Sequence, residues 1–324
     1  MIEVKKYNSD FIKDWNTFLN DSKNGTFMFQ REFVEYHNDR FTDYSIIIYN
    51  QNKVVGLFPA NIKEKTLNSH GGLTYGGLIV GKTIKLNEYL KIFKSMLVFL
   101  NENGIEDINY KSVPIFYTSV PSQEEDYVFY LLEANNYRVD SSITVKNSER
   151  LSFQNRRKRI IKKAKNNNFI IKADNDFKAF WNKILSPNLF ERFQKTPVHS
   201  LNEIELLNFN FPNNIHQINI YDGETIIAGC TVFETKSVCH AQYISGNNYG
   251  RQSGALDMLF EYLITDLFNG KEFFDFGICN EKNGKYINHG LLDWKEGLGG
   301  RTYVHKFYNI ITSKHYLLDS VIKK

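Results

Sequence analysis

Polar side chains that can transfer protons stand in two apolar stretches of the C-terminal half. His240 and Gln242 alternate in VCHAQYISG, so both lie on one face of the expected strand and Tyr243 lies on the other. Asp275 stands between two phenylalanines, and a carboxylate in such surroundings needs a hydrogen-bonding partner. Two interpretations are open for each group. His240 is either a buried, satisfied histidine or a site residue, and Asp275 is either a structural anchor or a site residue.

A glycine-rich loop follows the His240 strand and leads into a helix. Gly246, Gly250 and Gly254 fall within SGNNYGRQSGALDML. The first amides of a helix lack internal partners and its dipole favours negative charge, so this loop predicts an anion site. Gly254 would let the backbone approach the anion, and Arg251 would add a charge-assisted contact. The G-x-G-x-x-G and G-x-x-x-x-G-K-[ST] patterns are absent, which removes the usual support for a dinucleotide or a triphosphate.

The elements that position this strand and loop occur twice. IIIYNQNKVVG (46–56) and INIYDGETIIA (218–228) align at a constant offset of 172 residues, and each predicts a β-hairpin. Asp222-Gly223 indicates a type I′ turn in the second hairpin. Each copy continues through a strand and a glycine loop to a helix, expected at 87–101 and 255–268, and then to another strand. The matched order favours duplication over a chance likeness of hairpins. It predicts an α+β fold with domains at 1–150 and 151–324, each a mixed, mostly antiparallel sheet flanked by helices.

A basic helix is expected at the start of the second domain, within residues 151–167. The segment RLSFQNRRKRIIKKAK (150–165) carries eight lysines and arginines and no acid. A solvated helix face and a cationic wall beside ligand phosphates both fit this pattern. Nucleic-acid binding fits it poorly, because aromatic side chains are not interleaved and no nucleic-acid-binding module surrounds the segment. A strand at 169–172 and a helix carrying Phe177, Phe180, Trp181 and Ile184 are expected next.

Composition limits the class of protein. The 324 residues are 42% hydrophobic, ample for a core, and the net charge of +4 is too small to indicate a nucleic-acid binder. No apolar stretch approaches the roughly 20 residues that span a bilayer, and the first residues lack an apolar signal core. Cys230, Cys239 and Cys279 are odd in number and lack metal-ligand spacing, which indicates free thiols. We therefore expect a cytoplasmic protein with no metal, no membrane association and no nucleic-acid partner.

Several motifs together resemble a known family. FDFGICNEKNGKYINHGLLDWKEGLGG (274–300) is similar to the C-terminal signature of the FemAB-like, tandem Gcn5-related N-acyltransferases (GNAT). RRKRIIKKAKNN resembles their central basic helix, and PVHSLNEIELL (197–207) resembles their P-V-H-S/T-L segment. Arg251 and Gly254 match the [Q/R]-x-x-G-x-[G/A] pattern, although Leu256 stands where a small residue is expected. SHGGLTYGG (69–77) is similar to a motif of members that acylate nucleotide-linked amino sugars for surface polysaccharides. The resemblance spans about Phe27 to Tyr308.

The resemblance implies two duplicated GNAT-like domains and an activity. It implies transfer of an acyl group from acyl-coenzyme A, either acetyl- or 3-hydroxybutyryl-CoA, to the amine of a dTDP-3-amino-3,6-dideoxyhexose for O-antigen, lipopolysaccharide or capsule biosynthesis. The first copy has LIVGKTIKLNEYL where the second has its glycine loop, so only the C-terminal domain should hold coenzyme A. Two alternatives remain: an aminoacyl-tRNA-dependent peptidoglycan peptidyltransferase of the same fold, and a non-catalytic nucleotide-sugar binder. The oligomeric state is left open.

Roles for individual residues follow from the resemblance and from the needs of acyl transfer, which are an amine base, oxyanion donors and a proton for the thiolate. His240 is the candidate base and Tyr243 the candidate acid, with Asp275 and Lys295 as further catalytic candidates. The residues expected to contact coenzyme A are Tyr243, Ser245, Gly246, Arg251, Gly254, Ala255, Asn288 and Lys295. The residues expected to contact the acceptor are His70, Tyr75, Gly76, Lys111, Arg156, Arg157 and His199. Cys279 has no evident histidine partner and is not expected to act as a nucleophile.

Overall fold

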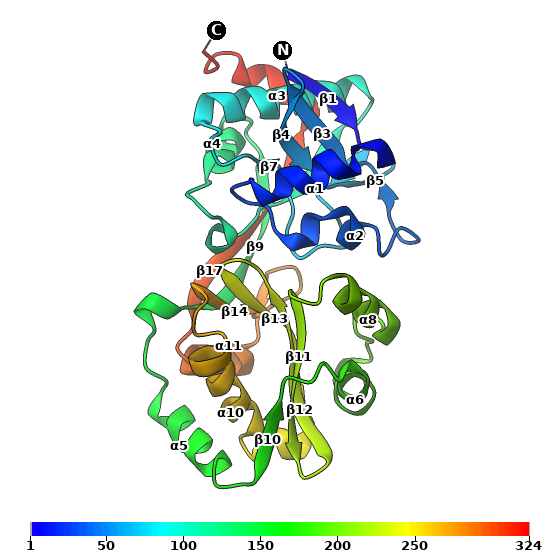
Figure 1. Cartoon of the computed structure of the whole chain (residues 1–324). Coiled ribbons are helices and arrows are strands. Elements are labelled where there is room, and N and C mark those ends of the chain that lie inside the picture. The colour runs from blue at the N-terminus through cyan, green and yellow to red at the C-terminus, as the bar shows by residue number, and fades with distance from the viewer. Residues whose placement is uncertain (1, 324) are drawn as a thin grey trace. The chain divides into compact units, whose positions relative to one another are not determined.

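The chain forms two compact units in the computed structural model, which describes residues 2–323 (Figure 1). Unit 1 contains residues 2–139 and 304–323, and unit 2 is the continuous segment Asp140–Tyr303. Strands β9 (Asn135–Lys146) and β17 (Arg301–Ile311) each begin in one unit and end in the other. The sequence placed the boundary near residue 150 and kept the C-terminal residues with the second domain, whereas the structure groups residues 304–323 with the N-terminal ones.

Unit 1 contains two runs of paired strands and four α-helices. One run has the order β1-β3-β4-β7, and the other has the order β17-β8-β6-β5-β2. The strands are β1 (Ile2–Lys6), β2 (Thr42–Asp43), β3 (Ile46–Asn50), β4 (Lys53–Phe58), β5 (Asn61–Lys63), β6 (Thr66–Asn68), β7 (Ile79–Val80) and β8 (Asp107–Lys111). The helices are α1 (Ile12–Asn20), α2 (Arg31–Val34), α3 (Leu86–Glu102) and α4 (Glu124–Leu131), with a 3-10 segment at Thr312–Leu318.

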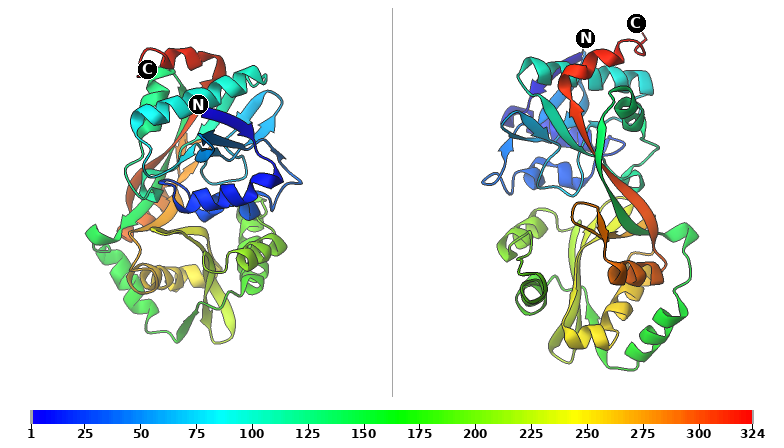
Figure 2. Two further views of the ribbon diagram at one scale, coloured as in Figure 1. Left: turned by 45° about the horizontal axis from the view of Figure 1, so that its top comes forward. Right: turned by 180° about the vertical axis from the view of Figure 1, so that it is seen from behind.

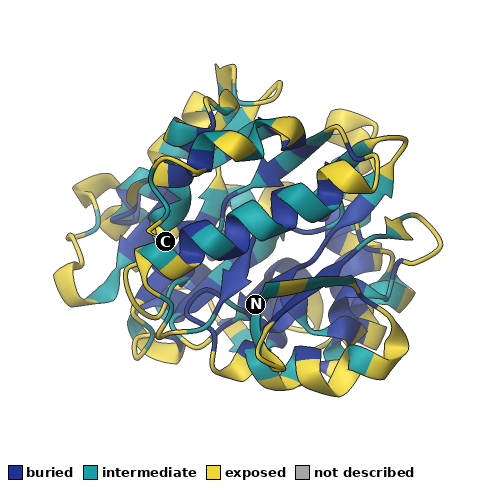
Figure 3. Cartoon of the chain, turned by 90° about the horizontal axis from the view of Figure 1, so that it is seen from above, coloured by how far each residue is buried: buried dark blue, intermediate teal, exposed yellow. Residues whose placement is uncertain are grey.

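Helix α3 supplies the apolar stripe that closes the core of unit 1. Its expected bounds of 87–101 agree closely with the observed Leu86–Glu102. Phe93, Met96 and Leu97 are completely buried and pack in one cluster with strand residues such as Ile46 and Ile48. Figure 3 shows the strands mostly in the buried colour, with exposed residues on turns and outer helix faces. The helix expected at 87–101 is therefore present, and its buried apolar residues face the core of unit 1.

Unit 2 is a six-stranded sheet covered by helices on both faces (Figures 1 and 2). The order is β10-β11-β12-β13-β14-β9, with β10 (Phe169–Lys172), β11 (Ile215–Asp222), β12 (Thr225–Glu234), β13 (Val238–Gly246) and β14 (Phe273–Ile278). One face carries α5 (Asn155–Ala164), α10 (Ala255–Tyr262), which continues as a π-helix (Leu263–Leu267), and α11 (His289–Gly297). The other carries α6 (Phe177–Phe180), a π-helix (Trp181–Leu185), α7 (Ser186–Phe193) and α8 (Leu201–Asn210). Short elements α9 (Asn248–Gln252), β15 (Asn280–Glu281) and β16 (Tyr286–Ile287) complete it.

The repeat is confirmed by a β-bulge that occurs at the same position in both hairpins. In the β3–β4 pair the register shifts so that Val55 has no opposite residue. In the β11–β12 pair the register shifts so that Ile227 has none. Val55 and Ile227 are related by the same offset of 172 residues that aligns the two sequence segments. Because a bulge is a specific local feature of a strand pair, its recurrence at the same position supports duplication of the whole unit.

The tight turn of the second hairpin differs from the expected geometry. The turn residues of the second hairpin are Gly223 and Glu224, because Asp222 pairs with Thr225, and of the two only Gly223 has positive φ. A glycine at the first central position fits type II′, so the expected type I′ turn is wrong there. The first hairpin instead has positive φ at both of its turn residues, 51 and 52, as type I′ requires.

Candidate functional site

Strands β13 and β14 share only a short ladder. They pair in parallel over Val238–His240 and Phe273–Asp275, and β13 then continues to Gly246 without a partner on β14 among the described residues. A register shift on the other side of β13 leaves Gln242 as an extra residue opposite β12. Bulges of this kind interrupt the ladder and redirect side chains, often beside active sites. The strands therefore part at His240 and Asp275, and beyond this fork β13 has no paired strand on its β14 side among the described residues.

His240 and Asp275 form a hydrogen-bonded pair at this fork. His240 Nδ1 lies 2.8 Å from Asp275 Oδ2, and Asp275 is 3% exposed. The same carboxylate accepts hydrogen bonds from Ser142 Oγ at 2.7 Å, Thr144 Oγ1 at 3.0 Å and the Gly277 amide at 2.9 Å. Burial alone would raise the pKa of Asp275, but the charge and hydrogen bond of His240, with the hydrogen bonds from Ser142 and Gly277, lower this pKa to about 2. Asp275 is thus an ionised acceptor that orients His240 and leaves Nε2 for another partner.

The Tyr243 hydroxyl is hydrogen-bonded to His199. The sequence assigned Tyr243 to coenzyme A and His199 to the acceptor. The His199 backbone N–H donates to the Tyr243 hydroxyl oxygen at 3.1 Å, and His199 Nδ1 lies 2.6 Å from the same oxygen. Trp181 Nε1 donates to the His199 carbonyl at 3.0 Å, which fixes the segment before α8. His199 does not cap α8, since Ser200 is the N-cap and forms a capping box with Glu203. The phenol is therefore held on the α6–α8 face of the sheet. His240 faces the same side, because the bulge at Gln242 shifts the alternation, so the expected placement of His240 and Tyr243 on opposite faces is wrong.

The end of β13 is held by a residue that sequence reasoning missed. Asn188 on α7 donates to Ser245 Oγ at 2.9 Å and to the Gly246 carbonyl at 2.9 Å. Arg251 also binds the Gly246 carbonyl, so its guanidinium braces the loop. Asn247 caps the short helix α9 by accepting from the Gly250 amide at 2.7 Å. No motif marks Asn188, because its partners lie more than fifty residues away in the sequence and become neighbours only through folding.

Backbone conformation and packing explain why residue 254 is a glycine, independently of the expected approach of a ligand. Its φ is +82°, and a Cβ there would lie 2.6 Å from Ile160 Cγ2 on α5. It is the N-cap of α10, and no side chain caps this helix. Ala255, the first residue of α10, is fully buried. The position therefore requires glycine for its left-handed backbone and for close packing against α5.

The basic helix α5 is matched by acids that are distant in the sequence. Arg157 Nη1 lies 3.0 Å from Asp257 on α10, and its Nη2 lies 3.4 Å from Asp293 on α11. Arg156 pairs with the same Asp293 carboxylate. The charged groups of Arg156 and Arg157 thus have protein partners, and their proposed role at the acceptor stays a prediction.

Asn288 and Lys295 connect α11 to the end of β14. The Lys295 ammonium is 2% exposed and donates to the carbonyls of Gly277 and Ile278, both at 2.9 Å. Burial lowers the pKa of Lys295. Asn288 is the N-cap of α11 and accepts from the Leu291 amide at 3.0 Å. In this arrangement both side chains support the parted end of β14, and direct contact with coenzyme A stays a prediction.

The unit 1 candidates lie in a tightly closed loop. His70 is 2% exposed, and burial, aided by nearby His37 and Lys111, lowers its pKa to about 3, so it is neutral. Tyr75 is completely buried and its hydroxyl donates to Thr26 Oγ1 at 3.2 Å. Gly76 packs so closely on the Ser69 carbonyl that a Cβ would come within 2.0 Å of its oxygen. These residues form part of the interior of unit 1.

Lys111 braces the same loop from β8. Its ammonium donates to the carbonyls of His70 at 3.2 Å, Gly71 at 3.3 Å and Leu73 at 2.7 Å. All three N–H groups of the ammonium thus have backbone partners. Burial, with a smaller contribution from Arg138, lowers the pKa of Lys111 to about 8. Its assigned contact with the acceptor is untested.

Three further features concern the cysteines, the potential metal ligands and the lengths of the helices. Cys230, Cys239 and Cys279 are unpaired and buried, and burial raises the pKa of each thiol. Within residues 2–323, no group of three or more His, Cys, Asp or Glu side chains is arranged to hold a metal ion. Over the same residues, every helix is too short or too polar to cross a bilayer.

Comparisons with known proteins establish the fold. No family model matches the sequence, and no curated protein matches it. Solved structures do match over the whole chain: FemX has a TM-score of 0.64 at 11% identity, covering 99% of this chain and 100% of that one. L-PGS from Bacillus licheniformis has a TM-score of 0.57 at 10% identity, with coverage of 99% and 98%. A tandem GNAT protein from the clavulanic acid biosynthesis pathway has a TM-score of 0.52 at 9% identity, with coverage of 96% and 99%. The chain therefore has the FemAB-like, tandem GNAT fold, as the sequence motifs implied.

Proposed function

We propose that the chain is an N-acyltransferase that moves an acyl group from an acyl-coenzyme A thioester to an amine. The observation that carries the proposal is the fork between β13 and β14, with the His240–Asp275 pair at its apex and a bulge at Gln242 just beyond. An extended thioester ligand can lie along the unpaired edge of β13 and hydrogen-bond to its backbone. Its reacting carbonyl would then lie close to an imidazole that is already oriented by a carboxylate.

The proton transfers follow from the groups at the fork. With Nδ1–H donated to Asp275, His240 Nε2 carries a lone pair and removes a proton from the acceptor ammonium, directly or through water. The free amine attacks the thioester carbon, and amides near Tyr243–Gly246 stabilise the oxyanion. The carbon–sulfur bond breaks as Tyr243 donates its proton to the departing thiolate, and the tyrosinate takes the remaining excess proton of the attacking nitrogen, directly or through water. His199, whose Nδ1 contacts the phenol, positions Tyr243 for this step.

Coenzyme A is assigned to unit 2 alone. After β13, the chain forms a loop braced by Asn188 and Arg251 and then two successive helix N-termini, those of α9 and α10. Amides at such positions favour the pyrophosphate. After the corresponding strand of unit 1, β7, the chain passes directly to α3 without a short intervening helix. This difference between the copies supports one acyl-CoA site per chain.

The finer part of the proposal concerns the substrates. We assign the acceptor as a dTDP-3-amino-3,6-dideoxyhexose and the donor as acetyl- or 3-hydroxybutyryl-CoA, on the support of the SHGGLTYGG motif. Its test is a matrix of acyl-CoAs against dTDP- and UDP-linked amino sugars, with products identified by mass spectrometry. Acylation of UDP-sugars but not dTDP-sugars would contradict the assignment of the nucleotide.

A second candidate is aminoacyl transfer from tRNA to a peptidoglycan peptide, supported by the whole-chain likeness to the fold of FemX. The two candidates differ in their donor. Purified protein should bind acetyl-CoA by calorimetry and should contain no co-purified RNA if the first candidate holds. Transfer from charged tRNA, with no measurable affinity for acetyl-CoA, would favour the second. Binding of a nucleotide sugar without any transfer would identify a non-catalytic binder.

Replacing His240 tests the proposed base. His240→Asn should lower kcat by about 100-fold or more, the range associated with loss of a general base, while the Kd for acetyl-CoA stays near wild type. His216→Asn is the matched control, because His216 also lies on a strand of unit 2 and also contacts a carboxylate, Glu234. A kcat for His240→Asn within a few-fold of this control would show that His240 is structural.

A further inference from the structure

A cavity lies in unit 2 on the opposite face of the sheet from Tyr243 and His199. It has a volume of about 320 Å³. Ile218 of its lining belongs to the core under α10, whereas Tyr243 and His199 contact the π-helix residue Trp181 on the other face. The lining comprises Ala173, Asn175, His216, Ile218, Glu234, Leu267, Phe268, Gly270 and Lys271. None of these residues takes part in the proposed acyl transfer.

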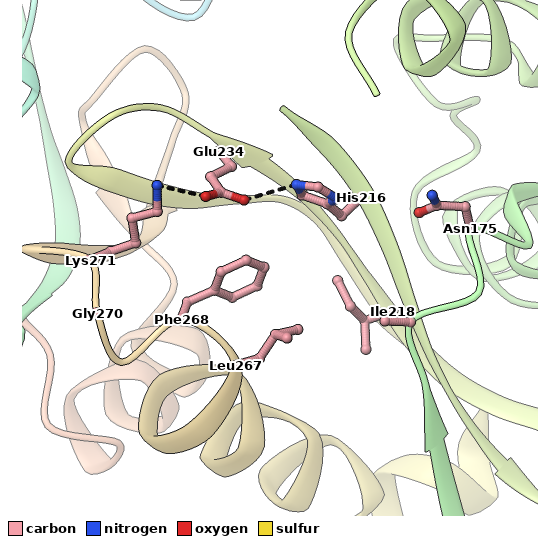
Figure 4. Close-up of a pocket in the computed structure, with 9 residues that line it drawn as sticks. Asn175, His216, Ile218, Glu234, Leu267, Phe268, Gly270 and Lys271 are labelled. Carbon is pink, nitrogen blue, oxygen red and sulfur yellow. Dashed lines mark hydrogen bonds and ion pairs between the residues drawn. The ribbon is translucent and has the colours of Figure 1, made fainter. Parts of the chain in front are cut away.

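The charges at the rim of this cavity are balanced. Glu234 lies between Lys271, at 2.6 Å, and His216 Nε2, at 2.9 Å, as Figure 4 shows. Lys271 also donates to the Thr235 carbonyl at 2.9 Å. The carboxylate and the ammonium thus neutralise each other, and the ammonium is further occupied by backbone. An anionic ligand would therefore meet no uncompensated cation here, and a cationic ligand would meet no uncompensated acid.

Two polar atoms of the lining remain without a protein partner. His216 Nε2 lies 2.9 Å from the Glu234 carboxylate, and in the tautomer that donates from Nε2 to this carboxylate the Nδ1 atom is an acceptor. Asn175 Oδ1 accepts from the Gln217 amide at 2.8 Å, which leaves Nδ2 as a donor. Neither Nδ1 nor Nδ2 has a hydrogen bond to any residue in 2–323. In Figure 4 the amide of Asn175 is turned toward the ring of His216.

The rest of the lining is apolar. In Figure 4 the side chains of Ile218, Leu267 and Phe268 lie below His216, and the ring centres of Phe268 and His216 are 6.2 Å apart. Leu267 ends the π-helical continuation of α10, a form of helix that is rare and often found at functional sites. A volume of about 320 Å³ is near the lower limit of small-molecule sites. It has room for on the order of ten non-hydrogen atoms.

We propose that this cavity is a binding site for a small neutral ligand that presents a hydrogen-bond donor beside an acceptor on an apolar body, as a primary amide or a lactam does. The ligand donates to His216 Nδ1 and accepts from Asn175 Nδ2, while its apolar part packs against Phe268 and Leu267. The site is independent of the acyltransferase proposal, because it uses different residues on the other face of the sheet.

Three probes of one size and shape test the charge and hydrogen-bonding class. Benzamide, benzoate and benzamidine are neutral, anionic and cationic versions of the same planar molecule. In saturation-transfer NMR titrations of the full chain at about pH 8, benzamide should bind at least tenfold more tightly than either charged analogue. Addition of saturating acetyl-CoA should leave this binding unchanged. Absence of benzamide binding at millimolar concentration, or equal or tighter binding of a charged analogue, would overturn the proposal.

Two variants locate the binding. A Cβ at Gly270 would meet no atom within 4 Å and the backbone there needs no positive φ, so Gly270→Leu adds an apolar side chain to the lining of the cavity without strain at its Cβ. His216→Phe keeps an aromatic ring, removes the acceptor and leaves Glu234 paired with Lys271. Each should weaken benzamide binding at least fivefold, whereas Gly81→Leu in unit 1 should not. Wild-type affinity in both Gly270→Leu and His216→Phe, with unchanged melting temperatures, would refute this site.

Discussion

Replacing Gly254 with alanine tests why a glycine stands before α10. An added Cβ would lie 2.6 Å from Ile160 Cγ2 and 3.2 Å from the Ile160 carbonyl oxygen, at a φ of +82°. An L-residue in the left-handed region costs about 1–2 kcal/mol. An extra methyl group in a packed contact costs about 1–3 kcal/mol. Together these effects should lower the free energy of unfolding of Gly254→Ala by about 2–5 kcal/mol.

The assay is thermal unfolding followed by circular dichroism. For a unit of this size the loss corresponds to a melting temperature lowered by roughly 5–15 °C. Gly270→Ala is the matched control, because its Cβ would meet no atom within 4 Å. Surface changes of that kind usually alter the free energy of unfolding by less than about 0.5 kcal/mol. Calorimetric titration with acetyl-CoA is measured on both variants below their melting temperatures.

Equal melting temperatures for Gly254→Ala and Gly270→Ala would refute the packing argument. If Gly254→Ala also lost acetyl-CoA affinity while melting like the control, the glycine would serve the ligand, as the loop sequence first suggested. A lowered melting temperature with nearly unchanged affinity would instead assign Gly254 to the contact between α10 and α5.

The remaining predictions concern buried charges. Burial raises the pKa of Glu125 to about 7, so the folded state favours the protonated carboxyl. Its contribution to the free energy of unfolding is therefore fully present below about pH 4.5 and is lost as the pH rises through about 7. Glu125→Gln should therefore raise the melting temperature at about pH 8 and leave it nearly unchanged at about pH 4.5, and a pH-independent difference would contradict this. Arg157→Met leaves the buried Asp257 unpaired and should lower the free energy of urea unfolding by about 3–5 kcal/mol. Arg156→Met, at an exposed pair, should change it by less than about 1 kcal/mol, and similar effects of the two would be inconsistent with their burial. Lys295→Met removes the hydrogen-bond donor of two β14 carbonyls and should lower the free energy of urea unfolding by about 1–3 kcal/mol. Wild-type stability would show that those two hydrogen bonds contribute nothing.

Local features of the fold could be predicted because they are encoded in neighbouring residues. The helix expected at 87–101 and the strand expected at 169–172 agree almost to the residue with α3 and β10. The basic helix was expected within 151–167, and α5 spans Asn155–Ala164 inside it. The π-helical continuation of α10 was not anticipated, since the same apolar stripe fits an α-helix. A π-helical turn holds one more residue between its hydrogen-bonded groups than an α-helical turn, and the apolar periodicity of the sequence does not reveal this difference.

The candidate site was only partly predictable because its contacts join distant segments. The pairing of His240 with Asp275 depends on two strands that happen to be adjacent in the sheet. Ser142 contacts Asp275 across 133 residues, and Arg157 contacts Asp257 across 100. A count of charges along α5 could not reveal its acidic partners on other helices. The residue types were therefore informative about chemistry, whereas their partners depend on tertiary structure.

The division of the chain has a consequence for its synthesis on the ribosome. Unit 2 is one uninterrupted segment, Asp140–Tyr303, whereas unit 1 needs residues from both ends of the chain. Strand β8 pairs with Phe307–Ile311 of β17, and α3 packs against Thr312–Leu318. The N-terminal part of unit 1, although translated before unit 2, lacks these partners until residues 307–318 emerge. All residues of unit 2 are therefore synthesised before unit 1 is complete. Until then the nascent N-terminal segment has an incomplete core, which exposes apolar surface to aggregation and to chaperones.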